Sequence, residues 1–405
     1  MLLSSDLLAG LRQNISLCDY FGGIPFKWNK ELNRLEVRSK KKLQLYGIPL
    51  YLACFYKLLA MIQVVYTWKR VKMFVITHNV MFIASYAVIG ASGYVFHKYA
   101  YCCASLFNNM IEYEERHYKG KHISKKDLKG TWLATWMVRL MTSTGILMPT
   151  LYHLDIIRNP CFPVYLGYWL SDQCQTDRIG LASPPTWSAK ELGTKIGISL
   201  LSFMNWNLLM TGIPFFVNVT LVITGHCLRS YIFQYGRDIR TNKEMAKNGN
   251  LIKKQTLAFR ELQLMSILYR EIYSKCLLVV MMISCIVMQV VCLYNTVTVF
   301  ARGGYKDESF QIGLNLVYFW CTFLAMFVIV VMFGILADVY CVAKNVHQEI
   351  SGTVDLKRSK WFVRFLKSCP VLRIYLGGSN FLDEMTPLTC EDFSIDQTVS
   401  LLLLK

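Results

Sequence analysis

Six apolar stretches each reach the roughly 20 residues that an α-helix needs to cross the hydrocarbon core of a bilayer. Across the 405 residues, 54% are hydrophobic and only 17% are charged, which is typical of an integral membrane protein and not of two or three soluble domains. The sequence therefore predicts an all-α membrane protein. The stretches are residues 47–68, 73–96, 132–155, 196–227, 276–300 and 311–338.

Lysine and arginine are distributed unevenly between the segments that connect these stretches. If the connections alternate between the two sides of a membrane, the side that holds the N-terminus carries 32 of these residues and the opposite side carries 9. Cytoplasmic loops are enriched in Lys and Arg, so the N-terminus is predicted to be cytoplasmic. The net charge of +18 then reflects membrane topology, and nucleic-acid binding is not predicted.

The segments between the stretches complete the predicted organisation. No signal peptide is recognised at the N-terminus. The predicted order is a cytoplasmic segment at 1–46, four spans within 47–227 with an outer loop at 156–195, a cytoplasmic helical segment at 228–275, two spans within 276–338, a second cytoplasmic helical segment at 339–375, and a terminal helix at 376–405.

Both long cytoplasmic segments carry amphipathic helical patterns. In 253–275 the apolar residues recur every three or four positions, and two arrangements remain open. This helix either lies on the anionic inner leaflet or is a cytoplasmic extension of spans four and five that packs against other helices. The stripe consists of Ala258, Leu262, Met265, Tyr269 and Ile272. A second such helix contains Trp361, Phe362, Phe365 and Leu366.

The terminal segment is far more polar than the six apolar stretches. It contains Glu391, Asp392, Asp396 and Gln397 before a run of leucines. A polar segment at membrane depth must be covered by protein or face water. If it crosses, it is a seventh span, the C-terminus lies outside, and the topology is the reverse of a G-protein-coupled receptor. Alternatively, Asp392 and Asp396 cap a short helix that does not span.

This organisation resembles the arthropod odorant and gustatory receptor superfamily. The likeness lies in the predicted topology of seven transmembrane helices with the N-terminus inside and the C-terminus outside, in residues 374–381 with Gly377 and Gly378, and in the terminal helix that ends abruptly at 398–405. Many gustatory receptors have Thr-Tyr near the end, whereas here Val399 follows Thr398. The odorant and gustatory branches both therefore remain open.

The resemblance implies a function and an assembly. It implies a chemosensory receptor in the cell membrane that acts as a ligand-gated, poorly selective cation channel, opened by a small-molecule odorant or tastant. Four subunits, identical or mixed with a co-receptor subunit, would surround one pore within membrane lipid. The pore would be lined by the terminal helix, through Asp392, Asp396, Gln397, Ser400, Leu401 and Leu404.

The ligand pocket implied by the resemblance lies in the outer halves of spans two, three, four and six. These halves are rich in aromatic residues with a few polar groups, as a small, weakly polar ligand requires. Aromatic residues also form interfacial belts, so this alternative stays open for each residue. The predicted pocket residues are Phe82, Met148, Tyr152, Phe203, Trp206, Asn207, Tyr318 and Phe319.

A few further residues complete the sequence-based predictions. Cys161 and Cys174 in the outer loop either form a disulfide, which an oxidising environment permits, or remain free thiols. Asp338, at the inner end of span six, is predicted to pair with a basic residue of the cytoplasmic layer. No catalytic, metal or cofactor motif is found, so neither an enzyme nor a cofactor is predicted. The competing functions are a membrane transporter and a receptor of the G-protein-coupled type.

Overall fold

The computed structural model describes most of two regions, residues 73–118 and 213–403, and parts of the rest. The described residues are 9–13, 15–16, 24–39, 73–118, 134–140, 213–241, 249–301, 308–352, 360–378 and 380–403, with single positions at 51, 55, 58, 61, 62, 65, 132 and 143. The helices and strands formed by the described residues are β1 (Phe26–Asn29), β2 (Arg34–Val37), α3 (Met73–Lys98), α4 (Ala100–Tyr118), α9 (Ile213–Thr241), α10 (Gly249–Tyr269), η3 (Arg270–Ser274), α11 (Leu277–Ala301), α12 (Glu308–Phe327), η4 (Val328–Phe333), α13 (Gly334–Gly352), α14 (Lys360–Ser368), β3 (Tyr375–Leu376), β4 (Asn380–Phe381) and α15 (Thr386–Leu403).

Three helical segments among the described residues are long and apolar enough to cross a membrane. They are Ile76–Lys98, Leu277–Thr298 and Leu316–Ile350. The last has 35 residues, and at 1.5 Å per residue it extends about 52 Å, well beyond a hydrocarbon core of about 30 Å. This helical segment is therefore longer than a membrane crossing requires. The predicted stretches 47–68 and 132–155 fall largely outside the described residues.

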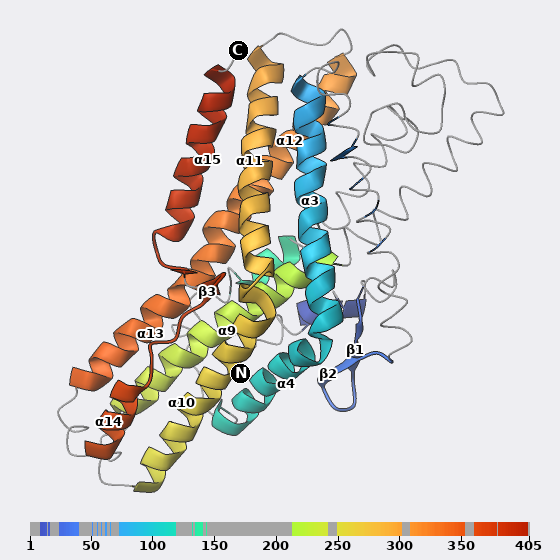
Figure 1. Ribbon diagram of the computed structural model, residues 1–405. Helices are drawn as coiled ribbons and strands as arrows, with labels where there is room; N and C mark the ends of the chain where they lie inside the picture. The colour runs from blue at the N-terminus through green and yellow to red at the C-terminus, as the bar shows by residue number, and fades with distance from the viewer. Residues whose placement is uncertain are drawn as a thin grey trace.

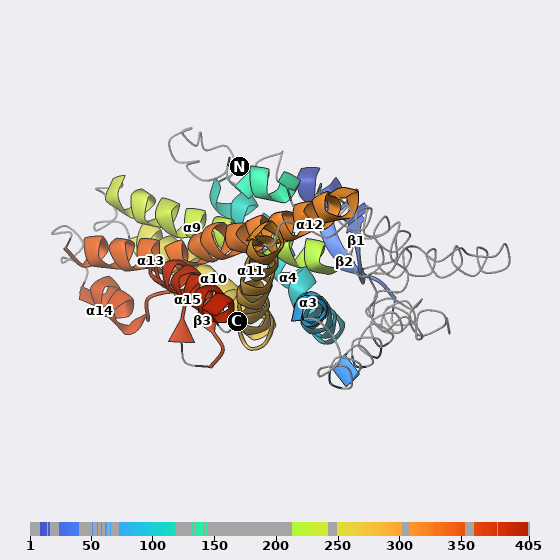
Figure 2. The same cartoon turned by 90° about the horizontal axis from the view of Figure 1, so that it is seen from above.

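The helices divide the molecule into two ends (Figure 1). The start of α3, the end of α11, the start of α12 and the end of α15 lie together at one end, and α4, α10 and α14 lie at the other. From above, α11 lies between α3 and α15, and α15 is at the edge of the bundle (Figure 2). We refer to the end that contains α4, α10 and α14 as the helical layer.

Two long, nearly continuous helices connect the spans to the helical layer. The helix α10 runs through the π-helical turn η3 into α11, and α12 runs through η4 into α13. This continuity supports the extension of span five over a helix lying on the inner leaflet. The stripe predicted in 253–275 faces the protein interior, where each residue is at most 4% exposed; it comprises Ala258, Leu262, Met265, Tyr269 and Ile272. Burial of this apolar face stabilises the layer.

The second predicted amphipathic helix is α14. Phe362 is fully buried, whereas Trp361 is 57% exposed. The Trp361 ring stacks on Phe365 at 5.8 Å between centroids, so this part of the apolar stripe covers a neighbouring ring and does not enter the core.

Two short β-hairpins correct the all-α prediction. In the first, β1 pairs antiparallel with β2, and Asn29 Oδ1 accepts the backbone N–H groups of Glu31 and Leu32 to close the turn. This hairpin packs on α4, because Asn108 exchanges two hydrogen bonds with the backbone of Leu35. The N-terminal hairpin and α4 are thus in direct contact.

The helices α9 and α13 form the tightest pair in the helical layer. A Cβ atom at Gly236 would lie 2.6 Å from a Val346 methyl, and one at Gly225 would lie 2.6 Å from a Leu336 methyl. The close approach requires glycine at these positions.

An ion pair between Arg229 Nε and Asp338 Oδ2, at 2.5 Å, joins the same two helices. The prediction that Asp338 pairs with a basic residue of this layer is therefore confirmed.

Candidate functional site

A buried polar cluster lies where α3, α11 and α12 meet, near the end of the molecule opposite the helical layer. His78 Nδ1 lies 2.6 Å from the Tyr318 hydroxyl oxygen. The edge of the His78 ring faces Phe82, with 5.0 Å between ring centroids. His78, Phe82 and Tyr318 are each at most 2% exposed. The cluster therefore combines three aromatic rings with one polar pair.

A second buried hydrogen bond lies one residue away on α3. The Thr77 hydroxyl donates to Asn295 Oδ1 of α11 at 2.7 Å, and Asn295 is fully buried. Span five, which contains Asn295, is not among the spans predicted to form the pocket. The available signal is an amide inside an apolar helix, because a polar group at membrane depth needs a partner.

The predicted pocket residues divide into three groups. Phe82 and Tyr318 lie in the cluster around His78. Phe319 is 62% exposed, because consecutive residues of a helix point about 100° apart and only Tyr318 faces α3. Phe319 therefore lies on the exposed surface of the helix and not in the buried cluster, contrary to the prediction. The remaining pocket residues, Met148, Tyr152, Phe203, Trp206 and Asn207, lie outside the described residues, as do Cys161 and Cys174.

Five of the six predicted pore residues lie on α15, which has one buried face and one open face. The buried face contains Cys390, Ser394 and Thr398, each at most 8% exposed. Ser394 and Thr398 donate their hydroxyls to backbone carbonyls four residues earlier, at 2.8 Å, so they enter the interior without unpaired donors. The open face presents Asp392, Asp396, Gln397 and Ser400, while Leu401 is half-buried and Leu404 lies outside the described residues.

The start of α15 excludes the capping alternative for the two aspartates. Asp383 Oδ1 accepts the Thr386 backbone N–H at 2.9 Å, and Thr386 Oγ1 accepts the Asp383 N–H at 3.1 Å. This reciprocal arrangement caps the helix. Asp392 and Asp396 lie in the interior of the helix, in its second and third turns.

A polar contact joins α15 to α11. Gln289 Nε2 donates to Glu391 Oε2 at 2.5 Å, in partly buried surroundings. A hydrogen bond to a carboxylate is stronger than one between neutral groups. This contact therefore helps to determine how α15 stands against the neighbouring helix.

The motif at 374–381 forms the hairpin β3–β4 in the approach to α15. Gly377 has a φ of +72°, which a side chain rarely adopts, and its N–H donates to the Ser274 carbonyl of η3 at 2.9 Å. Arg270 lies over the Tyr375 ring at 5.5 Å. The hairpin therefore holds the approach to α15 against the π-helical turn below α11.

An ion pair stiffens this turn on its exposed side. Lys275 Nζ donates to Glu271 Oε2 at 2.5 Å. This hydrogen bond is the main cause that lowers the pKa of the Glu271 carboxyl below its ordinary value.

Known structures with the same fold include two of an insect olfactory receptor. One is olfactory receptor OR5 of Machilis hrabei in complex with eugenol, with a TM-score of 0.64, 11% identity and 98% of each chain covered. The other is a second structure of the same receptor, also with a TM-score of 0.64 and 11% identity, covering 97% of each chain. No family model and no curated protein matches at the level of sequence.

The fold is thus that of the insect olfactory receptors over nearly the whole chain. The resemblance of the sequence to the arthropod chemoreceptors is confirmed at the level of fold.

Proposed function

We propose that the protein is a chemosensory receptor that works as a ligand-gated, non-selective cation channel in the cell membrane. The observation that carries this proposal is a fold shared with an insect olfactory receptor over 98% of both chains. The charge asymmetry supports an N-terminus inside and a C-terminus outside. The helical layer would then be cytoplasmic.

The proposed ligand is a small, weakly polar molecule that binds beside His78, Phe82 and Tyr318. The buried aromatic surface and the 2.6 Å contact between His78 and Tyr318 support this choice. The similar receptor is described in complex with eugenol, an odorant of this chemical kind. The further walls would come from spans three and four, at Met148, Tyr152, Phe203, Trp206 and Asn207.

The proposed pore is formed by α15 from several subunits. Its open face presents Asp392, Asp396, Gln397 and Ser400, which at membrane depth require water or protein around them. Four copies around one axis would place rings of carboxylates along a wet path and attract cations. Leu401 and Leu404 would form the hydrophobic constriction that gates by dewetting. The four copies would be identical or would include a co-receptor subunit.

The first test is whole-cell current recording from cells that express the full chain, alone and with an insect co-receptor, with eugenol as the first probe of a panel of odorants and tastants. Tyr318→Phe removes only the hydroxyl beside His78, and Phe319→Leu alters the exposed neighbour. We expect ligand-evoked cation current. The ligand concentration for half-maximal current should rise in Tyr318→Phe and should not change in Phe319→Leu. Absence of current across the panel, with correct surface expression, contradicts the proposal.

A second test addresses the topology. Epitope tags at both ends are stained in intact and in permeabilised cells. We expect the N-terminal tag only after permeabilisation and the C-terminal tag in intact cells. If both tags are hidden, α15 does not cross the membrane, and accumulation of labelled solute without current would then favour a transporter.

A further inference from the structure

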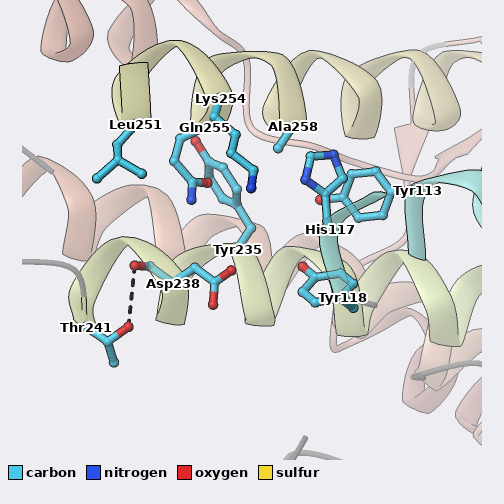
Figure 3. A pocket seen from close by; sticks show the side chains of 10 residues that line it. All are labelled: Tyr113, His117, Tyr118, Tyr235, Asp238, Thr241, Leu251, Lys254, Gln255 and Ala258. Carbon is cyan, nitrogen blue, oxygen red and sulfur yellow. Dashed lines mark hydrogen bonds between the residues drawn. The ribbon is translucent and has the colours of Figure 1, made fainter. Parts of the chain in front are cut away.

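A cavity of about 470 Å³ lies in the helical layer, away from the cluster at His78 (Figure 3). Its walls come from α4, α9 and α10. These helices supply three tyrosines, which are Tyr113 and Tyr118 from α4 and Tyr235 from α9. The α10 wall supplies Lys254 and Gln255. The volume is within the usual range for sites that bind small molecules.

The Tyr235 hydroxyl is the strongest sign that the cavity accommodates a polar group. Tyr235 is 2% exposed and reaches from α9 toward α10 (Figure 3). Its hydroxyl has no hydrogen-bond partner among the described residues, although it is buried. Buried polar groups are almost always paired, so an unpaired one at a cavity wall needs a partner from within the cavity.

The tyrosines act as donors at neutral pH. Burial raises the pKa of Tyr113, Tyr118 and Tyr235 above its ordinary value. Their hydroxyls therefore remain protonated, and the Tyr235 hydroxyl, which has no partner among the described residues, can donate to an oxyanion.

The charges around the cavity favour a ligand with a single negative charge. Lys254 is exposed at the α10 wall and makes no ion pair with another residue that the structure describes. On the opposite wall, Asp238 of α9 disfavours a ligand with several negative charges. His117 lines the cavity on the α4 side, and its Nε2 atom lies 3.0 Å from Glu261 Oε2. The other carboxylate oxygen of Glu261 forms an ion pair with Arg116. The charge of Glu261 is thus already balanced by the Arg116 guanidinium.

We propose that this cavity binds a small organic anion with one oxyanion group and an apolar or aromatic body. Lys254 and the Tyr235 hydroxyl would hold the oxyanion. The rings of Tyr113 and Tyr118, together with Ala258 on the α10 wall, would cover the body of the ligand. The oxyanion is a carboxylate or a singly charged phosphate, and the test below distinguishes the two.

Such a ligand would act on the positions of helices that continue into the spans. The helix α4 follows α3 after a single residue, and α10 continues through η3 into α11. An anion that joins α4, α9 and α10 would restrict their relative movement. This regulatory role rests on the proposed channel function, whereas binding itself does not.

The binding test uses the purified full-length protein and isothermal titration calorimetry. The probes are 3-phenylpropanoate, the singly charged diester methyl phenyl phosphate and the neutral 3-phenylpropanol. We expect saturable binding of at least one anion and weaker binding of the alcohol. Each of Lys254→Met and Tyr235→Phe should weaken anion binding by about tenfold, the effect of losing one hydrogen bond to a charged group. A preference for methyl phenyl phosphate over 3-phenylpropanoate identifies phosphate as the oxyanion.

Matched controls separate this site from general effects. Lys253→Met removes an exposed lysine next to Lys254 that does not line the cavity. Tyr269→Phe removes another buried hydroxyl without a partner among the described residues, away from the cavity. Both variants should bind the anion like the unmodified protein, and all four should melt at similar temperatures. Absence of saturable anion binding, or binding that depends on Tyr318 and not on Lys254, overturns the site.

An electrical arm separates the two proposals. The preferred anion is applied to the cytoplasmic face of excised patches during ligand-evoked current. A change in current that is lost in Lys254→Met supports regulation through the cavity. Binding without any current in the unmodified protein contradicts the channel function and leaves the site intact, whereas current without anion binding contradicts the site alone.

Discussion

Two pairs of neighbouring helices join in different ways. Between α9 and α13, glycines at 225 and 236 allow close backbone approach, and the ion pair of Arg229 and Asp338 lies beside them. Between α11 and α15, small polar residues of α15 face the interior, and one hydrogen bond, from Gln289 to Glu391, crosses the interface. The first pair is close-packed and resists displacement, while the second relies on polar contacts.

The difference indicates where movement is easiest. Close-packed interfaces transmit displacement as rigid units, because small volume changes are costly there. An interface of small hydroxyl residues loses little packing when one helix slides. We therefore expect α9 and α13 to act as a strut of the helical layer, and α15 to be the helix that shifts when a pore opens.

The largest effect is expected from filling the contact between α9 and α13. Gly236→Ala would place a methyl 2.6 Å from the stiff side chain of Val346. We expect the free energy of unfolding to fall by about 1–3 kcal/mol, measured by unfolding in detergent. Gly225→Ala should cost less, since it meets the flexible end of Leu336.

The control is Gly334→Ala, where a Cβ atom would meet nothing within 4 Å. It should be neutral or stabilise by up to about 1 kcal/mol through helix propensity. Equal melting of all three variants would show that the glycine contacts do not distinguish this helix pair.

The next effect concerns the polar contact between α11 and α15. Gln289→Leu leaves the partly buried Glu391 carboxylate without its donor, at a cost of up to about 1–3 kcal/mol. We expect a shift of up to about tenfold in the ligand concentration for half-maximal current, since 1.4 kcal/mol corresponds to tenfold.

The double variant Gln289→Leu with Glu391→Leu should restore most of the unmodified response, because two apolar partners of similar shape can replace a polar pair. If the double variant is no better than Gln289→Leu, this hydrogen bond does not determine the position of α15.

A smaller effect is expected from the open face of α15. Asp392→Asn and Asp396→Asn each remove one exposed carboxylate per subunit. We expect lower cation conductance, by up to about tenfold at low ionic strength and less at physiological salt, because salt screens exposed charges. Single-channel recording at two salt concentrations measures this. Glu31→Gln, at an exposed position of the N-terminal hairpin, should have no effect.

The smallest effect is expected from the ion pair between α9 and α13. The side chains of Arg229 and Asp338 are 27% and 43% exposed, so solvent screens their attraction. A double-mutant cycle with Arg229→Met and Asp338→Asn should give a coupling free energy of at most about 1 kcal/mol. A much larger value would mean that charge, and not the glycine contacts, holds this pair together.

Much of the architecture is predictable from local patterns. The helix α11 begins and ends within one residue of the stretch predicted at 276–300, and α3 within two residues of 73–96. The stripe from Ala258 to Ile272 is buried as its spacing indicates. These features depend on hydropathy and helical periodicity, which neighbouring residues in the chain determine.

The composition of the site is less predictable. Tyr318 and Phe319 have the same aromatic character, yet one is buried and the other exposed, because the facing of each residue depends on which helix packs against it. Asn295 and the cavity beside Tyr235 involve helices far apart in sequence. The hairpin β1–β2 lies in a segment where basic residues obscure the strand pattern.

By itself, the sequence determined the apolar helices, the asymmetry of charge, the polar terminal helix and the resemblance to the arthropod chemoreceptors. All of these follow from residue type and spacing along one segment. The tertiary structure alone decided that His78 meets Tyr318, that α15 turns Asp392 and Asp396 outward, and that three tyrosines line a cavity in the helical layer. These pairings depend on contacts between distant segments, and local patterns carry no information about which helices meet.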